Sequence, residues 1–380
     1  MCHFHFPRRA AFFFLTGISA LILTGLFFPF PLGAIIHFKY PPGLDSPAVE
    51  AAASDISEAE MRRIMEKLTG EEFSGREFGT EYGRNAAEYI AAELQSYGYA
   101  PTLEEGTSFF QKIPSGASEG QNVLAVLPGS DPELAETFII LCAHYDHLGA
   151  RKSPVTEAYG REGREEPGEF RMIYYPGADD NASSVAILLS VAKAMKRMPA
   201  APKHSLLFLF TDGEEKGLLG ARHWVANPTV PHENIQLVIN LDMNGRLNQK
   251  SRLYIFAART GTGLEAWCHA GNTAEEPLNL IFPWSVLPRA DHAAFLQEEI
   301  PVLLVVAGFS PFYHTPRDTV ETVRFPGMKR IAEYVLRTVV RMACAENVTE
   351  YREEWVREKC LVEDEMAGFF ADAAEDNDSE

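Results

Sequence analysis

Residues 205–220 read SLLFLFTDGEEKGLLG, and they join an apolar run to a cluster of acids. The run at residues 206–210 is typical of a strand that is buried on both faces of a sheet. Carboxylates follow at Asp212, Glu214 and Glu215, although a lone charge that leaves water is strongly destabilising. The two glutamates would repel each other there unless a cation neutralises one and the other holds a proton. An ordinary solvated loop is the alternative, and motifs elsewhere in the chain argue against it.

Composition and net charge limit the number of hydrophobic cores, the partners and the disulfides that this chain can have. A chain of 380 residues, 46% of them hydrophobic, can bury one large core or two modest ones. Its formal net charge of -19 argues against a nucleic-acid partner, because the phosphates would be repelled. Five cysteines are too few for a disulfide scaffold, although Cys268, Cys344 and Cys360 could include one bridge.

The N-terminal residues form a membrane-targeting pattern. Arg8 and Arg9 precede an uncharged stretch at residues 10–36, of which residues 10–28 contain no proline. That length suffices to span a bilayer, and the arginines before it favour export of the rest of the chain. We expect residues 1–40 to be an uncleaved signal-anchor or a cleaved signal peptide. The remainder would then be membrane-anchored or secreted, on the periplasmic or extracellular side.

The apolar periodicity predicts one domain at residues 57–350, after a Pro- and Ala-rich linker at residues 41–56. Helical spacing at residues 57–68 and 87–94 gives way to short apolar runs that alternate with helices. Strands are expected at residues 109–113, 122–127, 137–143, 206–210, 237–241, 253–258 and 302–306, with helices at 183–198 and 328–344. This alternation predicts an α/β fold, a three-layer α/β/α sandwich with a largely parallel mixed central sheet. Residues 351–380 are expected to begin as a helix and to end as a disordered acidic tail.

Histidines and acids stand where the predicted strands end. The candidates are His144 and Asp146, Asp179 and Asp180, Glu214 and Glu215, Asp242, and His314 and Asp318. Open α/β sheets bind ligands at the carboxyl ends of their strands, so we expect these side chains to lie together. Taken singly, His144 could be a core histidine, Asp180 a helix cap and Asp242 a turn residue. Their coincidence at successive strand ends favours a metal site, and imidazole with carboxylate suits zinc.

The ordered motifs HxD, GADDNAS, TDGEEKG, NLDMNG and HTPRD resemble the co-catalytic di-zinc aminopeptidases, the group that holds aminopeptidase Y and secreted bacterial leucyl aminopeptidases. The resemblance covers roughly residues 58–344, including the segment Ser74-Gly75-Arg76. It implies a zinc-exopeptidase fold, shared with glutaminyl cyclases, and two Zn²⁺ per chain. One zinc would be held by His144, Asp180 and Asp242, and the other by Asp180, Glu215 and His314. Glu214 would be the general base, Asp146 would orient His144, and the remaining residues near the ligands or the substrate pocket would be Asp291, His292 and Asp318.

The resemblance implies hydrolysis of peptides that carry a free N-terminus. Metal binding lowers the pKa of water from about 15.7 to about 7, and Glu214 could pass the released proton to the leaving amine. Two alternatives stay open. A glutaminyl cyclase-like acyltransferase would use one zinc and an acid cluster, whereas a non-catalytic receptor or scaffold of this fold would be expected to have lost ligands. A charged insert at residues 151–169 is a candidate lid over the site.

Overall fold

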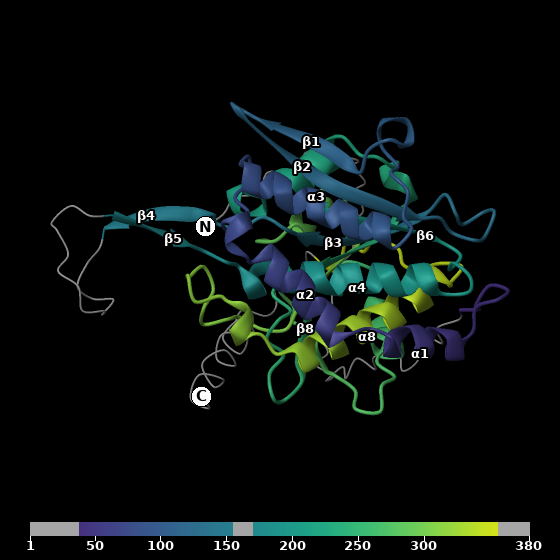
Figure 1. The fold of residues 1–380 in the computed structure, drawn as a ribbon. Helices are drawn as coiled ribbons and strands as arrows, with labels where there is room; N and C mark the ends of the chain where they lie inside the picture. The colour runs from purple at the N-terminus through teal and green to yellow at the C-terminus, as the bar shows by residue number, and fades with distance from the viewer. Residues whose placement is uncertain (1–37, 155–169, 356–380) are drawn as a thin grey trace, which may run out of the picture. The chain divides into compact units, whose positions relative to one another are not determined.

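A mixed eight-stranded sheet lies at the centre of the computed structural model, which describes residues 38–154 and 170–355 (Figure 1). The strand order is β1-β2-β6-β3-β7-β10-β8-β9, and β4 with β5 forms a second, two-stranded sheet. Four neighbouring pairs are parallel, namely β6–β3, β3–β7, β7–β10 and β8–β9, whereas β1–β2, β2–β6 and β10–β8 are antiparallel. The strand bounds are β1 Phe110–Ser115, β2 Ser118–Leu127, β3 Phe138–His144, β4 Ala150–Pro154, β5 Phe170–Tyr174, β6 Ser205–Thr211, β7 Ile235–Leu241, β8 Arg252–Phe256, β9 Asn279–Ile281 and β10 Val302–Val306.

Strand β6 is buried on both faces, as the continuous apolar run predicts. Its side chains alternate between two clusters, because successive residues of a strand point to opposite faces. Phe208 and Phe210 pack into the larger cluster, and Leu207 and Leu209 pack into the smaller one. The sheet therefore has an apolar layer on each face. The polar side chains lie beyond these layers, where the central strands end.

Helices cover both faces of this sheet and complete the predicted three-layer sandwich. Helices α1, α2, α3, α4 and α8 lie on the face that is turned to the viewer in Figure 1, and α5 and α7 pack against the other face. The helix bounds are α1 Ser46–Ser54, α2 Glu58–Leu68, α3 Glu81–Ser96, α4 Ser184–Arg197, α5 Leu219–Ala226, α6 Leu264–Gly271, α7 His292–Leu296 and α8 Phe325–Ala343.

The N-terminal part of the domain begins earlier than the sequence predicts. Helix α1 lies inside the stretch 41–56 that we expected to be a linker, so that prediction is wrong for most of its length. Asp45 caps the helix, since its carboxylate accepts a hydrogen bond from the backbone N–H of Ala48 at 2.9 Å. Val49 and Ala53 are fully buried, and α1 packs against α8. The small side chains that suggested a linker are the ones that allow this close packing.

Several expectations fall on residues that the structure does not describe. They are the targeting segment as far as residue 37, residues 155–169 of the insert, and the tail from residue 356. Within residues 38–154 and 170–355, no helix is both long and apolar enough to cross a membrane. Cys142, Cys268 and Cys344 are buried free thiols, so no disulfide joins Cys268 to Cys344, one of the pairings that the sequence left open.

Candidate metal centre and its pocket

Segments that are far apart in the sequence bring the predicted residues to one edge of the sheet. His144 ends β3, Glu214 and Glu215 lie in a single helical turn just after β6, and Asp242 follows β7. Asp180 lies in the turn that precedes α4, and His314 lies in the loop after β10. Because β6, β3, β7 and β10 are parallel neighbours, their carboxyl ends meet, as the position of ligand sites in α/β sheets predicts.

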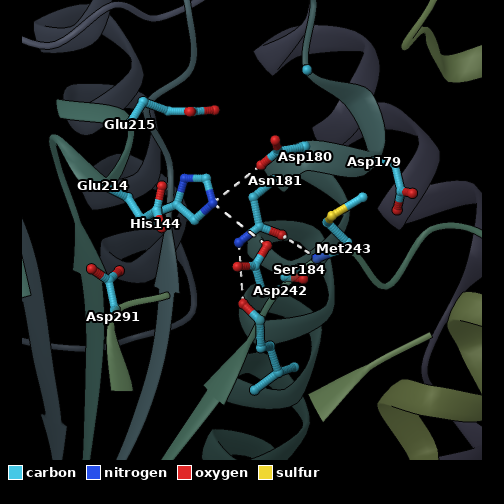
Figure 2. Close-up of polar contacts among 12 residues, drawn as sticks. His144, Asp179, Asp180, Asn181, Ser184, Glu214, Glu215, Asp242, Met243 and Asp291 are labelled. Carbon is cyan, nitrogen blue, oxygen red and sulfur yellow. Dashed lines mark hydrogen bonds and ion pairs between the residues drawn. The ribbon is translucent and has the colours of Figure 1, made fainter. Parts of the chain in front are cut away.

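A first ligand group contains His144, Asp180 and Asp242, whose candidate ligand atoms all lie within 4.8 Å of one another. His144 Nδ1 donates to the carbonyl oxygen of Asp146 at 3.2 Å. The other ring nitrogen, Nε2, faces Asp180 Oδ1 at 3.2 Å and Asp242 Oδ1 at 3.6 Å (Figure 2). One imidazole nitrogen is thus directed at two carboxylates, which is a set of donors that zinc accepts.

A second ligand group contains His147, Asp180, Glu215 and His314. His314 Nε2 lies 3.2 Å from Asp180 Oδ2 and 3.0 Å from Glu215 Oε2. His147 Nδ1 lies 2.8 Å from Glu215 Oε1 and 3.9 Å from Asp180 Oδ2. The two oxygens of Asp180 therefore face different histidines, Oδ1 toward His144 and Oδ2 toward His314.

His147 is the site residue that the motif comparison missed. It is fully buried in the segment that follows β3, three residues after His144. The sequence HYDH, which adds a second histidine to the HxD motif, is the signal that could have found it. Although these atoms lie close together, neither ring nitrogen of His147 makes an aligned hydrogen bond to a described residue, and the same holds for Glu215 Oε1 and His314 Nε2. Buried polar atoms are rarely left without partners. A cation between these atoms would satisfy them, so the residues present fit a metal ion.

The two adjacent glutamates have opposite electrostatic environments. Burial raises the pKa of Glu214 well above its ordinary range, and the nearby carboxylates of Asp291 and Asp242 raise it further. Burial acts in the same direction on Glu215, but its contacts with His147 and His314 outweigh it and lower the pKa. Glu215 is therefore an ionised ligand candidate, whereas Glu214 readily holds a proton.

Burial would raise the pKa of Asp180, but its close contacts with His144 and His314 outweigh this effect and lower the pKa. Its neighbour Asp179 is fully buried as well, but it points away from His144 (Figure 2). Asp179 Oδ1 accepts a hydrogen bond from the backbone N–H of Gly245 at 2.7 Å. Of this pair of aspartates, only Asp180 belongs to the ligand groups.

Two buried carboxylates hold the backbone that presents the ligands. Asp146 accepts hydrogen bonds from the backbone N–H groups of Glu214 at 3.0 Å and Glu215 at 3.3 Å. Asp318 does the same for Asp179 at 2.9 Å and Asp180 at 3.0 Å. These four bonds fix both acidic pairs in place.

The predicted role of Asp146, to orient His144, stays a prediction. Asp146 Oδ1 is 3.6 Å from His144 Nδ1, farther than the Asp146 carbonyl oxygen that accepts the ring N–H. The carboxylate also reaches the turn after β6, because that turn lies next to the end of β3 in the sheet. Both the carbonyl oxygen and the carboxylate of Asp146 therefore face the imidazole.

Asp291 and His292 are fully buried beside the site and belong to neither ligand group. Thr211 donates its hydroxyl hydrogen to Asp291 Oδ2, and Asp291 lies on the Glu214 side of His144 (Figure 2). Burial raises the pKa of Asp291 to about 7. His292 Nε2 donates to the carbonyl oxygen of Val286 at 2.7 Å. His292 thus supports the loop that leads into α7.

A pocket of about 170 Å³ opens beside the first ligand group. Its polar end is formed by His144, Asp180, Glu214 and Asp242, and its other walls are Met243, Leu287, Arg289, Ala290, Leu304, Val306, Phe309 and Tyr313. Glu214 is therefore the acid that faces the pocket without belonging to a ligand group. A larger cavity of about 470 Å³ at the start of α8 contains none of the ligand residues, so the pocket beside Glu214 is the candidate substrate site.

Comparisons with known proteins agree with this geometry. A probable leucine aminopeptidase of Arthroderma otae is 23% identical over 330 residues, which cover 83% of this chain and 80% of that protein. Two solved structures share the fold. The LapA aminopeptidase of Legionella pneumophila has a TM-score of 0.61 at 18% identity, over 80% of this chain and 77% of its own. The Porphyromonas gingivalis glutaminyl cyclase has a TM-score of 0.58 at 20% identity, over 75% of this chain and 98% of its own.

The family model described as "Peptidase family M28" matches residues 122–339. That range contains every residue of both ligand groups. The resemblance predicted from the ordered motifs is confirmed, and so is the fold that it implies. The chain belongs to peptidase family M28, and it is a metallopeptidase.

Proposed function

We propose that this protein is a zinc-dependent aminopeptidase with two metal positions that share Asp180. The observation that supports this most directly is the division of the Asp180 carboxylate, with one oxygen near His144 and the other near His314. A carboxylate that is placed in this way can bridge two cations. Two-metal sites of this kind act on peptide bonds in aminopeptidases.

The first ligand group, His144, Asp180 and Asp242, would hold one zinc. The second, His147, Asp180, Glu215 and His314, would hold the other, so His147 joins the set that the sequence predicts. Bound zinc would polarise the scissile carbonyl. It would also lower the pKa of water, so that hydroxide is available for the attack at neutral pH. Asp146 and Asp318 would keep the ligands in position, through the backbone bonds that they accept from the two acidic pairs.

Glu214 would be the general base. It lines the pocket, stands outside both ligand groups, and sits where burial favours its protonated form. Such a carboxylate takes a proton from the attacking water and then gives it to the nitrogen of the departing peptide. Its backbone N–H donates a hydrogen bond to Asp146, which fixes the position of the backbone from which the side chain extends.

The pocket also suggests which peptides are cleaved. Its acidic end would attract a free α-ammonium group, and this favours action at the N-terminus. Its walls are mostly apolar, with Leu304, Val306 and Phe309 among them, so we expect a preference for apolar N-terminal side chains. The volume of about 170 Å³ leaves room for one side chain of moderate size.

The two alternatives have less support. A glutaminyl cyclase-like acyltransferase would use one zinc and an acid cluster, whereas both ligand groups are complete here. A non-catalytic scaffold would be expected to have lost ligands, and each of the five that the sequence predicts lies in one of the two groups. We further propose that the domain acts outside the cytoplasm, because residues 10–28 form an apolar stretch preceded by arginines.

The test combines metal analysis with a substrate panel. Zinc per chain is measured by mass spectrometry, and hydrolysis is measured on the 4-nitroanilides of Leu, Phe, Lys and Asp. N-acetyl-leucine 4-nitroanilide is the control for the free amine, and a peptide with N-terminal Gln is the control for cyclisation. We expect both metal positions to be filled and the Leu and Phe substrates to be preferred. Cleavage of the acetylated substrate, or cyclisation without hydrolysis, would overturn the proposal.

A further inference from the structure

The guanidinium group of Arg76 is fully buried, and it connects three segments of the chain. Its Nε donates to the carbonyl oxygen of Tyr145 at 2.7 Å, and its Nη2 donates to that of Gly177 at 2.9 Å. Its Nη1 donates to the carbonyl oxygens of Pro176 and Leu68, both at 2.7 Å. All four bonds go to backbone oxygens, which the rigid fork of an arginine can reach in several directions at once.

These carbonyls belong to the segments that carry metal ligands. Tyr145 lies directly after His144, and Gly177 lies three residues before Asp180, at the start of the turn that presents it. Leu68 is the last residue of α2. One side chain therefore ties the end of β3 to the Asp180 turn and anchors both to a helix.

The backbone around Arg76 makes the same connection. The backbone N–H of His147 donates to the carbonyl oxygen of Arg76 at 3.4 Å, and that of Gly149 donates to Gly75 at 3.0 Å. Gly75 has a φ of +74°, and a Cβ there would lie 2.5 Å from the Gly149 carbonyl oxygen and 2.6 Å from that of Tyr175. Only glycine allows this approach. The segment Ser74-Gly75-Arg76 is thus packed between the two ligand-bearing segments.

Arg76 also places a positive charge beside the acids without occupying their oxygens. Burial lowers its pKa to about 10, while the carboxylates of Asp146, Asp180 and Asp318 counteract this effect, so the group stays protonated at neutral pH. An arginine paired directly with Asp180 would compete with a metal ion for the carboxylate oxygens. Because its bonds end on neutral carbonyls, those oxygens stay available.

We propose that Arg76 is a positioning residue, which sets the spacing between His144 and Asp180 before a metal ion binds. This inference rests on the proposed metal centre, since it concerns the segments of His144 and Asp180, two of the three that form the first ligand group. It assigns a role to the Ser74-Gly75-Arg76 segment, which lies outside the matched range 122–339. The guanidinium does not touch the substrate, and it acts through the geometry of the ligands.

The test compares Arg76→Lys with Arg341→Lys. Arg341 is a buried arginine near the far end of α8, bonded to the Arg337 carbonyl oxygen and to Thr273, and it provides a matched control for a buried cation. Lysine keeps the charge but, with a single nitrogen, cannot reproduce the four bonds that the three guanidinium nitrogens make. We expect Arg76→Lys to weaken zinc binding roughly 10–100-fold, as for other residues that orient metal ligands. At saturating zinc its kcat should fall while KM changes little, and the visible spectrum of bound Co²⁺ should change.

A purely structural role would give a different result. If both variants lower the melting temperature but both keep wild-type zinc affinity, kcat and Co²⁺ spectrum, the proposal is wrong. Should Arg76→Lys fail to fold, amide exchange in wild-type protein decides. With zinc removed, the amide hydrogens of His147 and Gly149 should remain protected. Fast exchange at these two positions until zinc is added would show that the metal, and not the Gly75-Arg76 segment, holds the chain that follows β3, and would overturn the proposal.

The same measurements separate this inference from the proposed function. A wild-type protein that binds no zinc and cleaves no aminoacyl anilide contradicts the proposed function. The exchange of the His147 and Gly149 amides would still report whether the Gly75-Arg76 segment holds the chain that follows β3 in that protein.

Discussion

Replacement of Glu214 by Gln removes a proton acceptor from the pocket and leaves both ligand groups intact. The backbone bond from Glu214 N–H to Asp146 does not depend on the side chain, and Gln has the same length. Burial already disfavours the charged form of this carboxyl, so a neutral amide should be accommodated with little loss of stability. Zinc content and KM should therefore stay close to those of the wild type.

Turnover, in contrast, should collapse. Loss of a general base lowers the rate roughly 10²–10⁴-fold, which raises the activation barrier by roughly 3–5 kcal/mol. The assay measures kcat and KM on leucine 4-nitroanilide together with zinc per chain. A fall in kcat with KM unchanged would mean that the lost interaction belongs to the transition state.

Glu215→Gln provides the matched control, because it makes the same change one residue away. Glu215 lies between His147 and His314, so this variant should bind zinc less tightly and regain part of its activity when zinc is added. Near-normal kcat in Glu214→Gln, accompanied by loss of zinc, would refute the assignment and exchange the roles of the two residues.

Three further predictions concern the shared ligand, pH and topology. Asp180→Ala should lose both zinc ions, because its two oxygens face one histidine of each ligand group. Asp179→Ala should be milder, since its Oδ1 accepts a hydrogen bond from the Gly245 N–H, and metal analysis compares the two variants. Burial lowers the pKa of His292 to about 4, so below about 6.5 protons bind mainly to the unfolded chain. The free energy of unfolding should thus fall by roughly 3 kcal/mol from pH 6.5 to 4, and denaturant titrations of His292→Gln should show a smaller fall. Full-length protein should resist carbonate extraction from membranes if residues 10–28 are an uncleaved anchor.

Each of these has an outcome that would contradict it. Equal or greater zinc loss in Asp179→Ala would mean that the wrong aspartate was chosen as the shared ligand. For His292, the titrations are run in chelator so that release of zinc does not add to the pH dependence, and parallel curves for variant and wild type would remove the assigned cause. Recovery of a soluble form that begins after about residue 34 would indicate a cleaved signal peptide.

Much of the fold was predictable because the central strands are continuous apolar runs. Four central strands are buried on both faces, namely β3, β6, β7 and β10. In a globular domain, short continuous apolar runs of this kind are typical of buried strands. The acids and histidines that follow them could be placed together by one topological rule, that parallel strands meet at their carboxyl ends. Helix α1 was not predicted, because small residues such as alanine occur both in linkers and in helices. Only the packing of α1 against α8 distinguishes the two.

The parts of the site that were missed depend on contacts across long stretches of sequence. Arg76 bonds to backbone carbonyls 69, 100 and 101 residues away. Because every residue has a backbone carbonyl, the sequence does not indicate which ones accept these bonds. The Asp146 carboxylate likewise crosses from β3 to the turn after β6. His147 was visible in the sequence, but only its buried, unpartnered nitrogens distinguish it from a core histidine.

The order of the ligands along the chain bears on when the enzyme can become active. His314 is the last of them, and it follows β10, which enters the sheet between β7 and β8 after both have been synthesised. Pairings between such distant segments form slowly. A nascent chain therefore carries His144, Asp180 and Glu215 without a complete second ligand group, so the peptidase should stay inert until β10 and His314 have been synthesised and have joined the sheet. Other polypeptides are then exposed to peptidase activity only after β10 has been inserted into the sheet.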